Sequence, residues 1–126
     1  MRADASRSFP KLPRTSWQMT WTVETLGPLV DAEIEALPKD MQAAFLRPAE
    51  RVEAVGLERI GAPHVKHLQG KLWEMRLTGR DGIARAIYVT ATGRRVVVVH
   101  AFVKKSQKTP RADLELAEQR VKETHP

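Results

Sequence analysis

The chain has 126 residues, a length that suits a single domain with a real hydrophobic core. Its 21 Lys and Arg residues outnumber its 15 Asp and Glu residues, and the resulting net charge of +6 favours a polyanionic partner such as nucleic acid. It has no cysteine, which excludes disulfides and thiolate nucleophiles, and no apolar run of about 18 residues, which excludes a membrane-spanning helix.

The first 15 residues differ from the rest of the chain. They are rich in Arg, Pro and Ser and show no apolar periodicity, so we expect a disordered basic arm over residues 1–15 and one folded domain over residues 16–126. The apolar stretch of a secretory signal is missing from this arm. Together with the absence of cysteine, this predicts a cytoplasmic protein that does not bind membranes.

The first half of the domain predicts one strand and two helical segments. Residues 16–25 are rich in Trp, Thr and Val and indicate a strand. Residues 29–38 indicate a short helix, and residues 39–56 carry apolar side chains at helical spacing. Pro48 predicts a kink in the second helix and Gly56 its C-terminal cap. We expect both helices to cover one face of a sheet.

The second half changes to the period of strands. Residues 70–79 alternate, with Trp73, Met75 and Leu77 on one side, and the Arg-Asp-Gly turn that follows predicts a hairpin with residues 83–90. Residues 96–103, "VVVVHAFV", are apolar on both sides, as in an interior strand.

A last helix is predicted for residues 110–123, with Pro110 in its first turn and Thr109 as N-cap. The order of strand, two helices, strands and helix gives an α+β fold, an antiparallel sheet with the N-terminal helices packed on one face. The other face should be free, and Arg76 points to it by alternation.

Several kinds of active site are not favoured by the sequence. There is no Gly-rich phosphate loop, and His64 and His67 lie three residues apart without an evident third ligand, so we predict neither a metal nor a cofactor. Metal-free chemistry on a phosphodiester needs only cations and one group that transfers a proton.

Cationic side chains of the second half meet this need. Neighbouring antiparallel strands can bring them together on one surface although tens of residues separate them in sequence. His100 has two interpretations: it acts as an acid or base on that surface, or it is buried and bonded to backbone. The residues expected to gather there are Lys71, Arg76, Arg85, Tyr88, Lys104, Lys105 and Lys108.

Three blocks of sequence carry a family resemblance. They are "LWEMRLTG", "IARAIYVT" and "RVVVVHAFVKKSQKTPRADLELAEQR". These blocks resemble the RelE/HigB type of toxin, and in particular its phage-derived branch, within the RelE/ParE superfamily. The resemblance covers nearly the whole chain from about Met19, and it implies the compact RelE-like α+β fold.

The resemblance also implies a function. Such toxins belong to type II toxin–antitoxin systems, bind in the ribosomal A site and cleave the translated mRNA without a metal, through attack of the ribose 2′-OH on the adjacent phosphate. A helix-turn-helix antitoxin of the HigA type neutralises them, and the complex binds operator DNA through the antitoxin.

The residue roles follow from the same resemblance. Arg76 and Arg85 would contact the phosphate, His100 would transfer a proton, and Lys104 and Lys105 would anchor RNA. Lys71, Tyr88 and Lys108 complete the expected RNA-binding set, and Tyr88 and Lys71 are the reserve for proton transfer. Two alternatives stay open: a toxin of this fold that acts by binding, for example on DNA gyrase, and a prophage accessory protein that binds nucleic acid.

Overall fold

The computed structural model describes residues 21–46, 65–80, 82–103 and 108–125. In chain order they form strand β1 (Thr22–Thr25), helix α1 (Pro28–Glu35), strands β2 (Val65–Gln69), β3 (Leu72–Gly79), β4 (Gly82–Ala91) and β5 (Arg95–Val103), and helix α3 (Arg111–Thr124). Residues 39–46 form a further helical stretch after α1. None of these helices is both long and apolar enough to span a bilayer.

The five strands form one sheet in the order β1-β5-β4-β3-β2. Gly79 pairs with Gly82, which confirms the predicted hairpin between β3 and β4. A second tight turn joins β4 to β5, where Gly93 and Arg94 have φ angles of 88° and 59°. All pairs are antiparallel except β1 with β5, which are parallel. The predicted α+β class is confirmed, and the parallel edge pair is a feature that the alternation pattern did not reveal.

One face of the sheet carries the larger core. Every second side chain of β3 and β4 points to this face, where α1 and the helical residues 39–46 cover it. Each of the large apolar side chains contributes roughly 1.5–3 kcal/mol when it leaves water, so this packing is the main source of stability. The buried residues include Val30, Leu37, Met41 and Phe45 from the helices and Met75, Leu77, Ala86, Tyr88, Val96 and Val98 from the strands.

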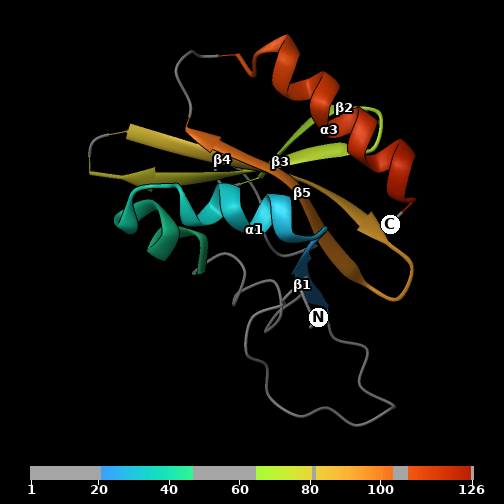
Figure 1. The fold of residues 1–126 in the computed structure, drawn as a ribbon, viewed down its shortest axis with the longest axis horizontal. Coiled ribbons are helices and arrows are strands. Elements are labelled where there is room, and N and C mark those ends of the chain that lie inside the picture. Colours follow the sequence, from blue (N-terminus) through green and yellow to red (C-terminus); the bar gives the residue numbers. More distant parts are fainter. Residues whose placement is uncertain (1–20, 47–64, 81, 104–107, 126) are drawn as a thin grey trace, which may run out of the picture.

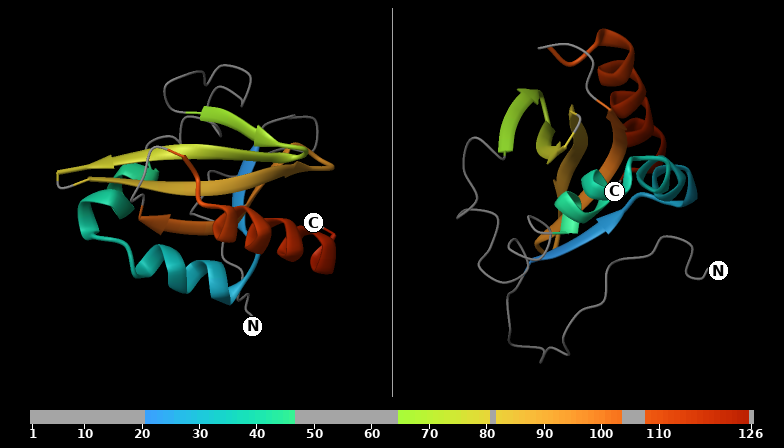
Figure 2. Two further views of the ribbon diagram at one scale, coloured as in Figure 1. Left: turned by 90° about the horizontal axis from the view of Figure 1, so that it is seen from above. Right: turned by 90° about the vertical axis from the view of Figure 1, so that its left-hand side faces the viewer.

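The opposite face is packed by α3, so the expectation of a free second face is wrong in part (Figure 1). Leu114, Ala117 and Val121 recur at helical spacing and pack on buried side chains of the sheet, among them Ile87 and Val97. The β3–β4 hairpin extends past the first residues of α3 (Figure 2). Among the described residues, α3 does not cover this end of the second face.

The register of β4 and β5 contains a bulge. Ile87 is opposite His100 and Tyr88 is opposite Val98, which leaves Val99 as an extra residue of β5. Before the bulge Val98 belongs to the core under α1, and after it His100 points to the α3 side. The bulge therefore decides which face His100 joins.

The helices and strands differ from the sequence expectations in three places. Helix α1 ends at Glu35, ahead of Pro38, and β2 is a strand whose residues the sequence pattern did not identify. Helix α3 has Pro110 as N-cap with no side-chain cap, so the prediction of Thr109 as N-cap is wrong. The predictions for the arm over residues 1–15, for Pro48 and for Gly56 concern residues outside the described ranges.

A first prediction concerns the close approach of the hairpin to the helical residues 39–46. A Cβ atom on Gly79 would lie 2.7 Å from Cγ of Met41 and 2.9 Å from Oδ2 of Asp40. The same Asp40 carboxylate accepts the backbone N–H of Arg80, so it is not free to move away. We expect Gly79→Ala to lower the free energy of unfolding by about 1–3 kcal/mol in urea denaturation. Gly27→Ser is the control, because its Cβ position is open; equal stability of the two variants would contradict this packing.

Candidate nucleic-acid interface

A buried ion pair lies under the open end of the second face. Arg85 on β4 places Nη1 3.0 Å from Oε2 of Glu74 on β3, and the two side chains are 1% and 3% exposed. Thr109, just before α3, accepts a hydrogen bond from Arg85 Nη1 and donates one to Glu74 Oε2 at 3.1 Å. We call Glu74, Arg85 and Thr109 the buried cluster. Through these hydrogen bonds of Thr109, the buried cluster connects the start of α3 to β3 and β4.

This burial gives Arg85 a different role from the one that the sequence predicted. A guanidinium in the interior needs its carboxylate partner, because an unpaired buried charge costs several kcal/mol. Arg85 cannot contact the phosphate of a substrate while it is bonded to Glu74 and Thr109 beneath the surface. The structure therefore assigns it to the support of the interface and not to its exposed part.

Arg76 stays accessible. It lies directly opposite Arg85 in the register of β3 and β4 and is partly exposed. Two arginines in this position would repel each other, but Glu74 neutralises Arg85 and so permits a second cation beside it. Among the described residues Arg76 has no hydrogen-bond or ion-pair partner, so its planar fork is available to an anion.

Two lysines extend this charge. Lys66 on β2 is exposed and lies opposite Glu74, and Lys108 is exposed and adjoins Thr109. We call Lys66, Arg76 and Lys108 the cationic surface. The sequence did not single out Lys66, because the strand that carries it was not predicted. The predicted residues Lys104 and Lys105 lie outside the described residues, between the end of β5 and Lys108.

His100 is bonded on both sides of its ring. Nδ1 lies 3.0 Å from Oε1 of Glu33 on α1, and Nε2 lies 2.6 Å from Oδ1 of Asp113 on α3. The ring also stacks on Phe102 with centroids 5.0 Å apart. Only 6% of the residue is exposed. We call Glu33, His100, Asp113 and Arg120 the carboxylate network, since Arg120 Nη2 lies 2.9 Å from the second oxygen of Glu33.

The electrostatics of this network favour the charged forms. Burial alone would lower the pKa of His100, but the hydrogen bonds to the carboxylates of Glu33 and Asp113 outweigh it and raise that pKa. Burial would likewise raise the pKa of Glu33, and the bonds from His100, Arg120 and the Ala101 N–H instead lower it from 4.5 to about 2. The contacts thus favour the protonated form of His100 and the ionised form of Glu33, beside the guanidinium of Arg120.

The geometry of His100 differs from both roles that the sequence suggested, the acid or base on the surface and the buried ring bonded to backbone. A ring with each nitrogen on a carboxylate has none left for a ribose hydroxyl, so we do not retain His100 as a proton-transfer group. It is buried, as in the alternative interpretation, but its partners are carboxylates and not backbone. The structural role is to join α1, β5 and α3.

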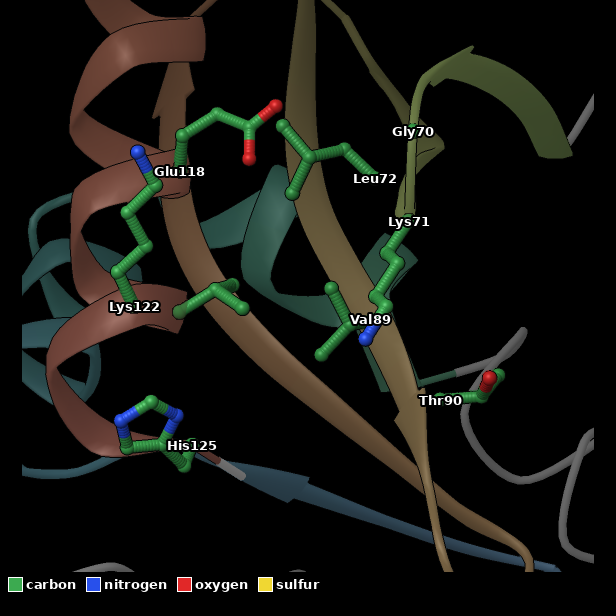
Figure 3. A pocket seen from close by; sticks show the side chains of 9 residues that line it. Gly70, Lys71, Leu72, Val89, Thr90, Glu118, Lys122 and His125 are labelled. Carbon is green, nitrogen blue, oxygen red and sulfur yellow. The ribbon is translucent and has the colours of Figure 1, made fainter.

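The two remaining predicted residues lie away from the cationic surface. Tyr88 is 1% exposed in the core on the other face of the sheet, where burial raises the pKa of its hydroxyl. Lys71 lies in the turn before β3, five positions from Arg76, which corresponds to roughly 17 Å along a strand. It lines a separate groove at the far end of α3 (Figure 3). Neither residue belongs to the site around Arg76.

The second histidine of the possible metal motif has another contact. His67 Nε2 lies 2.9 Å from the carbonyl oxygen of Gly70, and its ring lies beside Trp73. His64 is outside the described residues. Within the described ranges, no three His, Asp or Glu residues gather closely enough to hold a metal ion.

The buried cluster gives a prediction about stability. Glu74→Leu leaves the guanidinium of Arg85 in the interior without its carboxylate, and we expect it to lower the free energy of unfolding by about 3–5 kcal/mol. Adding Arg85→Met removes the unpaired charge and should restore most of the loss, apart from about 1–3 kcal/mol for the unsatisfied Thr109 hydroxyl. Urea denaturation of the four members of the cycle measures both; a double variant no more stable than Glu74→Leu would contradict the pairing.

The carboxylate network gives a prediction about pH. The pKa of His100 is raised on folding, so its contribution is complete below its usual 6.5 and is lost as pH rises through the raised value. The pKa of Glu33 is lowered to about 2, so its contribution is complete above 4.5 and is lost as pH falls toward 2. We expect the network to stabilise most between pH 4.5 and 6.5.

His100→Gln tests the alkaline side of this profile, because glutamine does not titrate. Melting temperatures measured by circular dichroism from mildly acidic to alkaline pH should decline above the usual pKa of histidine in the parent protein and stay flatter in the variant. The same alkaline decline in both proteins would assign it to other groups.

Comparison with known proteins places the chain in a family. The family model described as phage derived protein Gp49-like matches residues 32–122. No curated protein matches the chain. The matched range begins within α1 and includes β2 to β5, the buried cluster, the cationic surface and the carboxylate network. Because it covers well over half of the chain, the protein belongs to the phage-derived Gp49-like family, a toxin–antitoxin-associated family related to the RelE-like toxins.

Proposed function

We propose that the protein is the toxin of a type II toxin–antitoxin system and that it cleaves translated mRNA in the ribosomal A site without a metal ion. One observation carries the proposal: the exposed Lys66 and Lys108 and the partly exposed Arg76 adjoin the buried pair of Arg85 and Glu74, where α3 leaves the sheet open. The net charge of +6 and the family membership agree with an RNA target.

The chemistry suits such a surface. The ribose 2′-OH attacks the adjacent phosphorus, the bond to the 5′ oxygen of the next nucleotide breaks, and a 2′,3′-cyclic phosphate and a free 5′-OH result. Negative charge grows on the phosphate oxygens in the transition state. Arg76 offers two N–H groups to those oxygens from a rigid strand, and fixed donors of this kind contribute on the order of 10²–10³ in rate.

The proton must be taken by another side chain. His100 and Tyr88 are occupied or buried, and Lys71 lies at the opposite end of β3. We therefore assign proton transfer to the lysines that follow β5, of which Lys108 adjoins the buried cluster. Lys104 and Lys105 precede it in sequence and complete the proposed RNA contact.

A specific observation also favours a second candidate. Arg85 and His100, two of the three residues expected to act in catalysis, are held inside the protein by carboxylates. A surface of cations without an accessible imidazole can bind a polyanionic complex without cutting RNA. A toxin that acts by binding, for example on DNA gyrase, would have such a surface.

Mapping transcript 5′ ends after induction distinguishes the two candidates. The nuclease predicts new 5′-OH ends within translated codons soon after induction, because the cut releases the 5′ oxygen. The binding toxin predicts no such ends and a DNA-damage response. Growth arrest with neither result would remove both mechanisms.

The role of Arg76 gives the corresponding prediction. We expect Arg76→Ala to reduce mRNA cleavage about 10²–10³-fold and to abolish growth arrest. The side chain is partly exposed and has no partner among the described residues, so the melting temperature should stay within a few degrees of the parent protein. Arg94→Asn, an exposed turn arginine at the other end of the sheet whose left-handed φ suits asparagine, is the control and should stay toxic. Full toxicity of Arg76→Ala at equal expression would show that the cationic surface is not the site of toxicity.

A further inference from the structure

A groove of about 480 Å³ lies at the far end of the second face. Its walls are the last two turns of α3 and the turn between β2 and β3, and Leu72 and Val89 lie on its floor (Figure 3). Val121 of α3 also lines it. Leu72 and Val89 are 1% and 3% exposed, and they belong to the apolar cluster under α3. The groove is in the range of about 300–1,000 Å³ that ligand sites occupy, so it has room for several side chains.

The rim of the groove is mainly cationic. Lys71 rises from the turn on one side, Lys122 and His125 lie on the helical side, and all three are exposed (Figure 3). Among the described residues neither lysine has an ion-pair partner. Glu118 is the acidic residue of the rim, and its Oε2 already accepts a hydrogen bond of 3.0 Å from Gln69. Two cations thus face an apolar floor with a single carboxylate that is engaged elsewhere.

This combination distinguishes between two kinds of partner. Single-stranded nucleic acid sites stack bases on aromatic side chains, and the described lining of the groove contains no Phe, Tyr or Trp. An apolar floor with unpaired lysines on opposite sides suits a peptide whose apolar side chains enter the groove while its carboxylates lie between the lysines.

We propose that the groove binds an acidic peptide segment with apolar anchors from a partner protein. The identification of that partner as the antitoxin rests on the proposed function; the binding chemistry does not. The site is separate from the cationic surface, because Lys71 lies in the turn before β3 and Arg76 follows it by five positions, roughly 17 Å at the rise of a strand. Docking and toxicity therefore depend on different residues.

Binding is measured with two synthetic probes on the full chain. The first is an eight-residue peptide of alternating glutamate and leucine, and the second is an eight-nucleotide oligouridine. In amide NMR titrations the peptide should shift signals of Gly70, Leu72 and Lys122, and the oligouridine those near Arg76. No peptide-induced shift at the groove, or a stronger response there to the oligouridine, would overturn the proposal.

Charge variants of opposite sign keep this test independent of folding. Lys122→Glu should weaken peptide binding about tenfold, and Glu118→Lys should strengthen it. Lys39→Glu, an exposed lysine on the other side of the sheet, is the control and should bind as the parent protein does. Equal affinity of Lys122→Glu and the parent protein for the peptide would exclude the groove as the binding site.

A growth experiment separates this inference from the proposed function. Lys122→Glu should arrest growth like the parent protein but resist rescue by a co-expressed antitoxin that rescues the parent protein, while Lys39→Glu stays rescued. If the parent protein does not arrest growth, the proposed function fails, but the titrations still show whether the groove binds the acidic peptide. If Lys122→Glu is rescued as efficiently as the parent protein, the antitoxin does not use this site.

Discussion

The carboxylate of Glu33 is the contact on which the layers of this fold depend. This side chain extends from α1 and accepts hydrogen bonds from the backbone N–H of Ala101 on β5 and from both Nη groups of Arg120 on α3. It also bonds Nδ1 of His100. Since β1 pairs only with the first half of β5, the N–H of Ala101 would otherwise lie unpaired at a strand edge. One side chain therefore closes the edge of β5 and holds helices from both sides of the sheet against it.

Local chemistry predicted the parts of the fold that depend on neighbouring residues. The alternation of residues 70–79 assigned Met75 and Leu77 to one face and Arg76 to the other, and both assignments are confirmed because strand geometry fixes them. The bulge at Val99 is different. It depends on how β5 pairs with β4, and strict alternation would place His100 on the face of Val98. The Glu33–His100 contact spans 67 residues, so no local pattern contains it.

The same distinction explains the candidate site. The face of Arg76 could be identified from the sequence, because the direction of a side chain on a strand follows from alternation. The burial of Arg85 could not, because it requires Glu74 from the next strand and Thr109 from the residues before α3, 24 positions away. Lys66 was missed for a related reason. The segment of residues 65–69 is short and mostly polar, and it forms a strand because β3 provides the pairing partner.

Helix α3 adjoins both proposed sites, and its anchors determine how a partner at one could affect the other. Thr109 and Asp113 hold its start to the buried cluster and to His100, and Arg120 holds its last turns to Glu33 and to the carbonyl of Val99. A helix fixed at both ends transmits little movement when a peptide binds beside Lys122. A partner docked in the groove would thus leave the cationic surface in place, and under the proposed function it would inhibit the protein by covering that surface. Inhibition by distortion would instead require that the bonds of Glu33 break, at the cost of an unpaired strand edge and of the carboxylate partner of Arg120, while His100 would keep Asp113.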